Sequence, residues 1–272
     1  MTAFTPDTPG SRWWPVWDGL TIFRRDLLHL KHNPLEIASN LIFPVVMVVL
    51  FGYVFGSAIQ VPGGGSYRSY LMPGLFAMSQ VSAMGTLALA VADDAARGIM
   101  DRFRSMPMAR LAVPFGRTLA DLATGLLSIL GMAAVGLIVG WRADAGSARA
   151  AAAFGLLVLF RYALAWLGAY LGLLVKNPTT ADALVPLTFP VSMLANTFVS
   201  PAGMPAWLRV IADWNPISAL VSALRGLLGD PGAVTASAPL PLQHPVVTTL
   251  LWCAALIAVF MPLTAWRYGR SR

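Results

Sequence analysis

The sequence predicts an all-α integral membrane protein, with six transmembrane helices, an N-terminal interfacial amphipathic helix and a re-entrant extracellular helical hairpin before the last span. Of its 272 residues, 57% are hydrophobic and 11% are charged, whereas a soluble domain carries about 25% charged residues. Its apolar runs match the roughly 20 residues that a helix needs to cross a bilayer. The net charge of +7 comes from basic residues at the edges of these runs, where anionic lipids attract them, so we expect no nucleic-acid partner.

The first 34 residues precede the apolar runs. Residues 1–12 are rich in Pro and Thr, which predicts a disordered N-terminal tail. Within residues 13–34, apolar side chains recur at helical spacing on one face and charged ones on the other, which predicts a cytoplasmic interfacial helix. His29 and His32 lie three residues apart on the polar face. Two ligands alone make a poor metal site, so we expect a solvated face and no metal.

Residues 35–272 are predicted to form one six-span transmembrane domain. Its spans are expected at about Ile37–Ala58, Tyr70–Ala92, Pro114–Trp141, Ala151–Val175, Ala181–Val199 and Pro245–Trp266. Between the last two, residues 200–244 include the apolar stretch Ile217–Leu228, which prolines separate from its neighbours. This stretch is too short to cross the bilayer, and its length fits a re-entrant or interfacial helix on the outer face.

The distribution of Lys and Arg predicts the orientation. Twelve of these residues fall in the N-terminal region, the second and fourth loops and the C-terminus, and five fall in the loops on the other side. Both termini are therefore predicted to be cytoplasmic, which agrees with an even number of spans. We expect the chain in the cell membrane.

The most charged internal segment is Asp93–Val113, which two apolar runs flank. It cannot lie in hydrocarbon, because each charge at mid-bilayer costs roughly 2.5–3.5 kcal/mol on insertion scales. Its basic excess places it on the cytoplasmic side. We interpret residues 93–113 as the surface on which a cytoplasmic partner pushes.

Arg161 is the clearest anomaly, because it lies in the middle of the fourth span. An ionisable residue at this depth predicts a functional role and a partner. Asp121 in the third span is the favoured partner, and Asp182 near the start of the fifth span is the alternative. Two interpretations stay open: a structural ion pair, or a charge in the path of a transported molecule.

Two further spans carry polar or adaptable side chains that a transported molecule could contact. The second span offers Met78, Gln80 and Met84, and the fifth offers Ser192 and Asn196 near two prolines. Methionine adapts to varied apolar ligands, and polar groups in a span need a neighbour or a cavity. We interpret these residues, together with Arg161, as substrate-path candidates; ordinary helix–helix contact explains them equally well.

Several kinds of catalytic site are missing from the sequence. A phosphate-binding P-loop needs a Gly-Lys-Ser/Thr core, but the only lysines, Lys31 and Lys176, follow leucine and valine. No convergent pair of carboxylates suggests a reaction, and the single cysteine, Cys253, lies in an apolar run. The chain is therefore predicted not to be an enzyme and to have no catalytic residues.

Two stretches carry a resemblance to a known family. One reads RGIMDRFRSMPM from Arg97, and the other holds MPAWL from Met204, NPIS from Asn215 and ALR from Ala223. With the six-span layout and the N-terminal interfacial helix, they resemble the type 2 ABC export permeases, in particular the daunorubicin/doxorubicin-resistance branch. The resemblance covers nearly the whole chain.

The resemblance implies half of an exporter. Two permease chains, identical or homologous, would pair, and two separate ABC ATPase subunits would dock below and bind ATP and Mg²⁺, so this chain would hold no cofactor. The apolar character of the path candidates suggests an amphipathic drug or lipid as cargo. In that family the ATPase engages the N-terminal interfacial helix and the loop after the second span. The loop here gives as coupling residues Asp94, Arg97, Gly98, Asp101, Arg102, Arg104 and Pro107.

The sequence departs from the family at one position of this loop. The family usually has a glutamate two residues before the glycine, where this chain has Ala96, and Asp94 and Asp101 supply acidic groups nearby. Two rival classes stay open: a non-transporting membrane scaffold or assembly factor, and an intramembrane lipid-modifying enzyme or channel. The enzyme would need convergent acids or histidines near one membrane face, and the scaffold would not need two distinct helix–loop devices on opposite faces.

Overall fold

The computed structural model describes residues 42, 45–50, 67–100, 112–175, 177–197, 204–229 and 239–270, and within these ranges all regular structure is helical. The predicted all-α class is therefore confirmed. The N-terminal tail, the interfacial helix of residues 13–34, most of the first predicted span and residues 101–111 lie outside the described residues.

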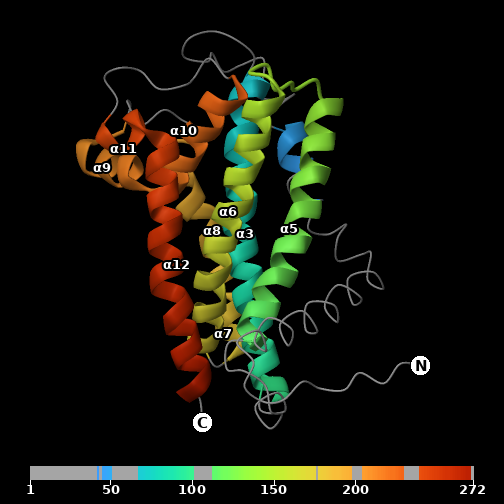
Figure 1. Cartoon of the computed structure of the whole chain (residues 1–272), viewed down its shortest axis with the longest axis vertical. Helices are drawn as coiled ribbons and strands as arrows, with labels where there is room; N and C mark the ends of the chain where they lie inside the picture. The colour runs from blue at the N-terminus through green and yellow to red at the C-terminus, as the bar shows by residue number, and fades with distance from the viewer. Residues whose placement is uncertain are drawn as a thin grey trace.

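Four described helices are long and apolar enough to cross a membrane: α3 (Tyr67–Ala96), α5 (Ala112–Ile138), α6 (Ser147–Leu174) and α12 (Pro245–Arg270). They match the second, third, fourth and sixth predicted spans. They run side by side along the long axis, with α3 and α6 in the middle and α5 and α12 at the two edges (Figure 1). These four helices indicate a multi-pass membrane protein. The count of six spans stays a prediction.

The central pair, α3 and α6, approaches closely because α6 has glycines four residues apart. A Cβ atom at Gly168 would lie 2.7 Å from the backbone oxygen of Met84, and one at Gly172 would lie 2.5 Å from that of Ala88. Only glycine admits the α3 backbone at this distance. These two positions therefore fix how near the two central helices can lie.

The fifth predicted span, about Ala181–Val199, is not one continuous helix. It is divided at Ala183 into α7 (Pro178–Asp182) and α8 (Leu184–Met193). The side chain of Asn177 begins α7 by accepting a hydrogen bond from the backbone N–H of Thr179 at 3.0 Å. Both short helices contact α3. Prolines explain part of the irregularity, because each removes a backbone donor from the helix.

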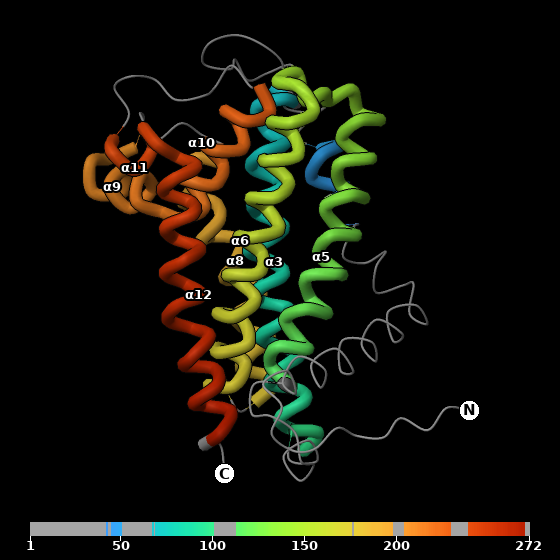
Figure 2. Tube along the Cα trace, in the orientation of Figure 1, coloured from blue at the N-terminus to red at the C-terminus, as the bar shows by residue number. Residues whose placement is uncertain are grey.

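Residues 204–229 and 239–244, which the structure describes before the last span, form α9 (Ala206–Trp214), α10 (Pro216–Leu228) and α11 (Leu240–Gln243). Asn215 begins α10 by accepting from the backbone N–H of Ile217 at 2.9 Å, and Gly229 ends it with a φ of 86°. In Figure 2 this group lies at the end of the bundle opposite the C-terminus of α12. We call this the α10 end, and the opposite one the C-terminal end.

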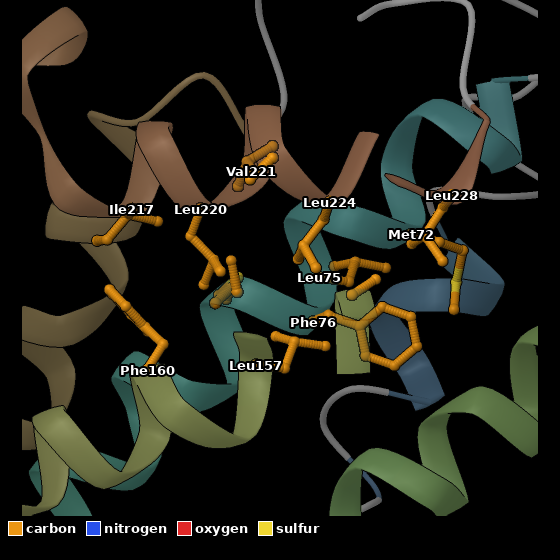
Figure 3. Close-up of a cluster of buried hydrophobic side chains, with 14 of the residues drawn as sticks. Met72, Leu75, Phe76, Leu157, Phe160, Ile217, Leu220, Val221, Leu224 and Leu228 are labelled. Atoms are coloured by element: carbon orange, nitrogen blue, oxygen red, sulfur yellow. The ribbon is translucent and has the colours of Figure 1, made fainter. Parts of the chain in front are cut away.

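The core of the α10 end is apolar. In Figure 3, side chains of α10 such as Leu220 and Leu224 point toward side chains of α3 and α6. The cluster contains Ile217, Leu220, Val221, Leu224 and Leu228 of α10, with Met72, Leu75, Phe76, Leu157 and Phe160. All ten are buried. The predicted short apolar helix is therefore present, and it packs among the ends of the long helices; its depth in a membrane stays a prediction.

Candidate functional site

Arg161 lies halfway along α6 and is 5% exposed. Its Nη2 atom lies 2.9 Å from Oδ1 of Asp121, and its Nε donates to Oδ2 of the same carboxylate at 3.0 Å. Nε also lies 3.0 Å from the backbone oxygen of Asp121. The predicted partner of Arg161 is therefore confirmed, while Asp182 is exposed on α7. This bidentate geometry is the strong form of an arginine–carboxylate pair.

Gln80 of α3 completes the Arg161 cluster, which consists of Gln80, Asp121 and Arg161. Nη1 of Arg161 donates to Oε1 of Gln80 at 3.3 Å. The amide nitrogen of Gln80 donates to the backbone oxygen of Phe76 at 3.0 Å and to Oγ of Ser79 at 2.8 Å. The cluster thus joins α3, α5 and α6. Each of the three guanidinium nitrogens of Arg161 therefore has an acceptor, which offsets part of the cost of burying the ion pair.

Gly125 makes room for the cluster. It follows Asp121 by four residues, so both face the same side of α5. A Cβ atom at position 125 would overlap Nε, Cδ and Cζ of Arg161. Asp121 and Gly125 together form the notch that receives the guanidinium. The spacing could have indicated this glycine once Asp121 was chosen as the partner.

The other substrate-path candidates lie mostly inside the bundle. Met78 and Gln80 are 2% and 1% exposed, and Ser192 is fully buried with its Oγ donating to the backbone oxygen of Thr188 at 2.8 Å. Met84 is half-buried beside Gly168. Asn196 is also buried. In this packing only Met84 has substantial exposure, so the buried candidates can contact a transported molecule only if the helices around them move apart.

Asn196 and a second buried arginine meet at the α10 end. Nδ2 of Asn196 donates to Oγ of Ser222 at 2.8 Å, and its backbone N–H donates to Oγ of Ser218 at 3.1 Å. Arg225, 3% exposed, donates from Nη2 to the backbone oxygens of Tyr70 and Thr197 at 3.3 and 3.1 Å. Arg225 is one of the five basic residues expected in the loops on the outer side, and the structure buries it instead. Its position in an otherwise apolar helix was the missed signal.

The charged segment begins at the C-terminal end of the bundle. Asp93 pairs with Arg97 at 2.8 Å, four residues on. Asp94 lies 3.4 Å from Arg117 of α5, and its side chain is 21% exposed, so this carboxylate links α3 to α5. Gly98 has a φ of 68°, which turns the chain away from α3. The other predicted coupling residues, Asp101, Arg102, Arg104 and Pro107, lie outside the described residues.

The described residues provide no group of three His, Cys, Asp or Glu side chains that could hold a metal ion. The site therefore consists of two buried arginine clusters and one partly exposed charged end. Together with four apolar spanning helices, it defines a multi-pass membrane protein that buries charge between its helices and presents a charged segment beyond them.

Comparison with known proteins identifies the family. The model of the ABC-2 type transporter family matches residues 19–228, and the chain belongs to this family. It is 28% identical over 247 residues to the daunorubicin resistance ABC transporter permease protein DrrB1 of Streptomyces coeruleorubidus, covering 90% of this chain and 83% of that protein. It is also 26% identical over 239 residues to the doxorubicin resistance ABC transporter permease protein DrrB of Mycobacterium tuberculosis, covering 82% and 79%.

The family membership confirms the resemblance drawn from the sequence. The chain is a transmembrane subunit of an ABC transporter, and its relatives are permease proteins. A permease subunit of this kind works with an ATPase subunit.

Proposed function

We propose that this chain is the permease half of an exporter that moves an amphipathic drug or lipid out of the cell, with a separate ATPase subunit as its motor. The family match over residues 19–228 carries the proposal. The drug names of the relatives, and the apolar setting of the path candidates, support an amphipathic cargo. The lack of a Gly-Lys-Ser/Thr core in the sequence assigns ATP and Mg²⁺ to the partner.

The assembled exporter contains two permease chains, identical or homologous, and two ATPase subunits. Each permease crosses the membrane six times, with α7 and α8 as an interrupted fifth span and residues 37–58 as the first. The termini are cytoplasmic, because the basic residues concentrate on that side. The α10 end then faces outside, and residues 200–244 form the re-entrant hairpin.

The ATPase subunit acts on the permease at residues 93–113. This segment connects α3 to α5, and the Asp94–Arg117 pair ties those two helices where the segment leaves α3. A push from the ATPase therefore moves α3 and α5 together. The ATPase must bind two conformations of the permease with different free energies, since otherwise ATP binding shifts no equilibrium.

The path runs between α3 and the interrupted span α7–α8. Five of its six candidate residues, Met78, Gln80, Arg161, Ser192 and Asn196, are buried in the present packing, which supports a closed state of the path. These five become accessible only as the helices separate, whereas Met84 is already partly exposed.

Charge reversal in the coupling segment tests this function. We expect the Arg102→Glu, Arg104→Glu double variant to stay in the membrane at the parental amount, but to lose both its ATPase partner and ATP-driven transport. Reversed charge would repel the acidic or dipolar groups that the arginines contact. The measurements are mild affinity purification and export of a fluorescent amphipathic drug.

Arg149→Glu is the matched control, because Arg149 is exposed near the start of α6, at the opposite end of the bundle. This variant should keep the ATPase partner and transport. Normal transport by the Arg102/Arg104 variant would contradict the coupling assignment.

A further inference from the structure

A small set of polar groups ties three elements together at the α10 end. We infer that Asn196, Ser218, Ser222 and Arg225 form a clasp that holds the ends of α3 and α8 against α10, and that this clasp must open for cargo to leave. The inference rests on the proposed function, because it concerns the outer end of the path between α3 and α8. Arg225 is assigned as a positioning residue for transport.

Arg225 is the centre of the clasp. It projects from α10, and its Nη2 donates to Tyr70 in the first turns of α3 and to Thr197 just beyond α8. Its guanidinium carbon lies 3.7 Å from the centre of the Tyr70 ring, which is cation–π distance. A single side chain therefore bonds to the backbone of two other elements.

Asn196 makes the second connection, between the end of α8 and α10. Its backbone N–H and its Nδ2 donate to the hydroxyl groups of Ser218 and Ser222, one turn apart on α10. All three side chains are at least nine-tenths buried. The end of α8 is thus fixed to α10 by two adjacent hydrogen bonds away from water.

The clasp closes the space between α3 and the end of α8. A Cβ atom at Gly74 of α3 would lie 2.5 Å from Cγ2 and 2.9 Å from the backbone oxygen of Thr197. Backbone and side chain are therefore in direct contact here, and no cargo can pass between them. The outer end of the path is shut where Arg225 bonds.

Among the described residues, α8 packs against α3 through a narrow face. Only Thr188 and Ser192 of its ten residues are buried, whereas Leu187, Phe189, Val191 and Met193 are exposed. The polar contacts at its end therefore add to a limited packing surface. A contact of this kind has two discrete states, bonded and open, which suits a releasable closure.

Arginine is specifically suited to this position. Its planar group carries five donors in a fixed fork, so it can reach two carbonyl oxygens and still lie over a ring. Lysine would keep the charge, but its ammonium cannot reproduce the fork. Arg225→Lys should therefore loosen the clasp while leaving the charge in α10 unchanged.

Thr197 offers a reporter of the state of the clasp. It is fully buried, and its Oγ1 finds no hydrogen-bond partner among the residues that the structure describes. Thr197→Cys therefore removes no bond in the described packing. Cys253→Ala supplies a background without the native thiol, which is buried in α12. Labelling by a membrane-impermeant maleimide added outside then measures exposure at the α10 end.

We expect slow labelling of Cys at position 197 in the assembled transporter without nucleotide, and labelling at least tenfold faster during ATP turnover. Arg225→Gln should label at least tenfold faster than the parent without nucleotide, with Arg225→Lys in between, and both should transport less cargo per ATP hydrolysed. Arg209→Gln is the matched control: Arg209 lies on α9, is half-exposed and pairs only weakly with Asp213 at 3.7 Å, so this variant should label at the parental rate.

Should Arg225→Gln fail to accumulate in the membrane, the Ser218→Ala, Ser222→Ala double variant carries the test, because it removes both acceptors of Asn196 with a smaller change in volume. Equal labelling rates in the parent and in the clasp variants would overturn the inference, as would a parental rate that ATP turnover leaves unchanged in a transporting complex. The comparison of labelling rates without nucleotide does not depend on transport, so it tests the clasp alone. If the proposed function is wrong, the purified complex contains no ATPase or shows no ATP-driven export. Failure of the clasp and failure of the proposed function therefore give different results.

Discussion

At the scale of single residues, the Arg161–Asp121 pair decides how α5 is attached. The two side chains are 6% and 12% exposed, and their closest atoms lie 2.9 Å apart. Moving two charges out of water costs several kcal/mol per ion, and their attraction offsets this only while both are present. Loss of one partner leaves a buried charge, whereas loss of both removes the cost as well as the attraction.

This asymmetry gives a prediction for Asp121. We expect Asp121→Ala to lower the free energy of unfolding by about 3–5 kcal/mol, because Arg161 is then buried without its carboxylate. The double variant Asp121→Leu, Arg161→Met should recover most of that loss, since an apolar pair fills a similar volume. Denaturation of the purified chain in mixed micelles measures both. Parental stability of Asp121→Ala would show that the ion pair does not hold α5.

The same double variant separates the two interpretations of Arg161. A stable variant that transports at the parental rate assigns the pair a structural role. A stable variant that no longer transports assigns Arg161 to the path. Comparing transport with stability in one protein is necessary, because either role lowers transport when the chain unfolds.

At the scale of helices, the closest packing is that of α3 against α6. Gly172→Ala should destabilise the chain by roughly 1–3 kcal/mol, because the new methyl group would meet the backbone oxygen of Ala88 and the side chain of Val91. Thermal unfolding in detergent measures the change.

Gly155→Ala is the control in the same helix. Beyond its own stretch of helix backbone, no atom of the described residues lies within 4 Å of a Cβ at Gly155, so the better helix propensity of alanine should leave stability unchanged or raise it by up to about 1 kcal/mol. Equal effects at positions 155 and 172 would contradict the assignment of Gly172 to close helix packing.

The helices also show what sequence patterns could and could not predict. Four long spans were predictable, because about 20 apolar residues in a row have few other uses. The break at Ala183 was not, because hydropathy records apolar content and not the path of the backbone. Asp121 was predictable as the partner of Arg161 from the rarity of charge in spans. Arg225 was counted with the loops because its apolar stretch, Ile217–Leu228, is too short to cross the bilayer.

At the scale of the whole molecule, the proposed function assigns a different role to each end of the helix bundle. The C-terminal end carries the charged segment and the Asp94–Arg117 pair, which couple α3 to α5. The α10 end is apolar and closed by polar contacts of Asn196 and Arg225. The Arg161 cluster joins α3, α5 and α6 about halfway along α6, between these two ends. A displacement of residues 93–113 can therefore reach the closed end through helices that are held together along their length.

The most direct measurement is ATP-dependent uptake of fluorescent amphipathic drugs and lipid analogues into inside-out membrane vesicles that contain this chain with its co-purifying ATPase. Uptake should require ATP, should vanish when the Arg102→Glu, Arg104→Glu variant replaces the parent, and should persist with Arg149→Glu. Uptake that is the same with and without this chain, or the absence of any ATPase from the purified complex, would contradict the account.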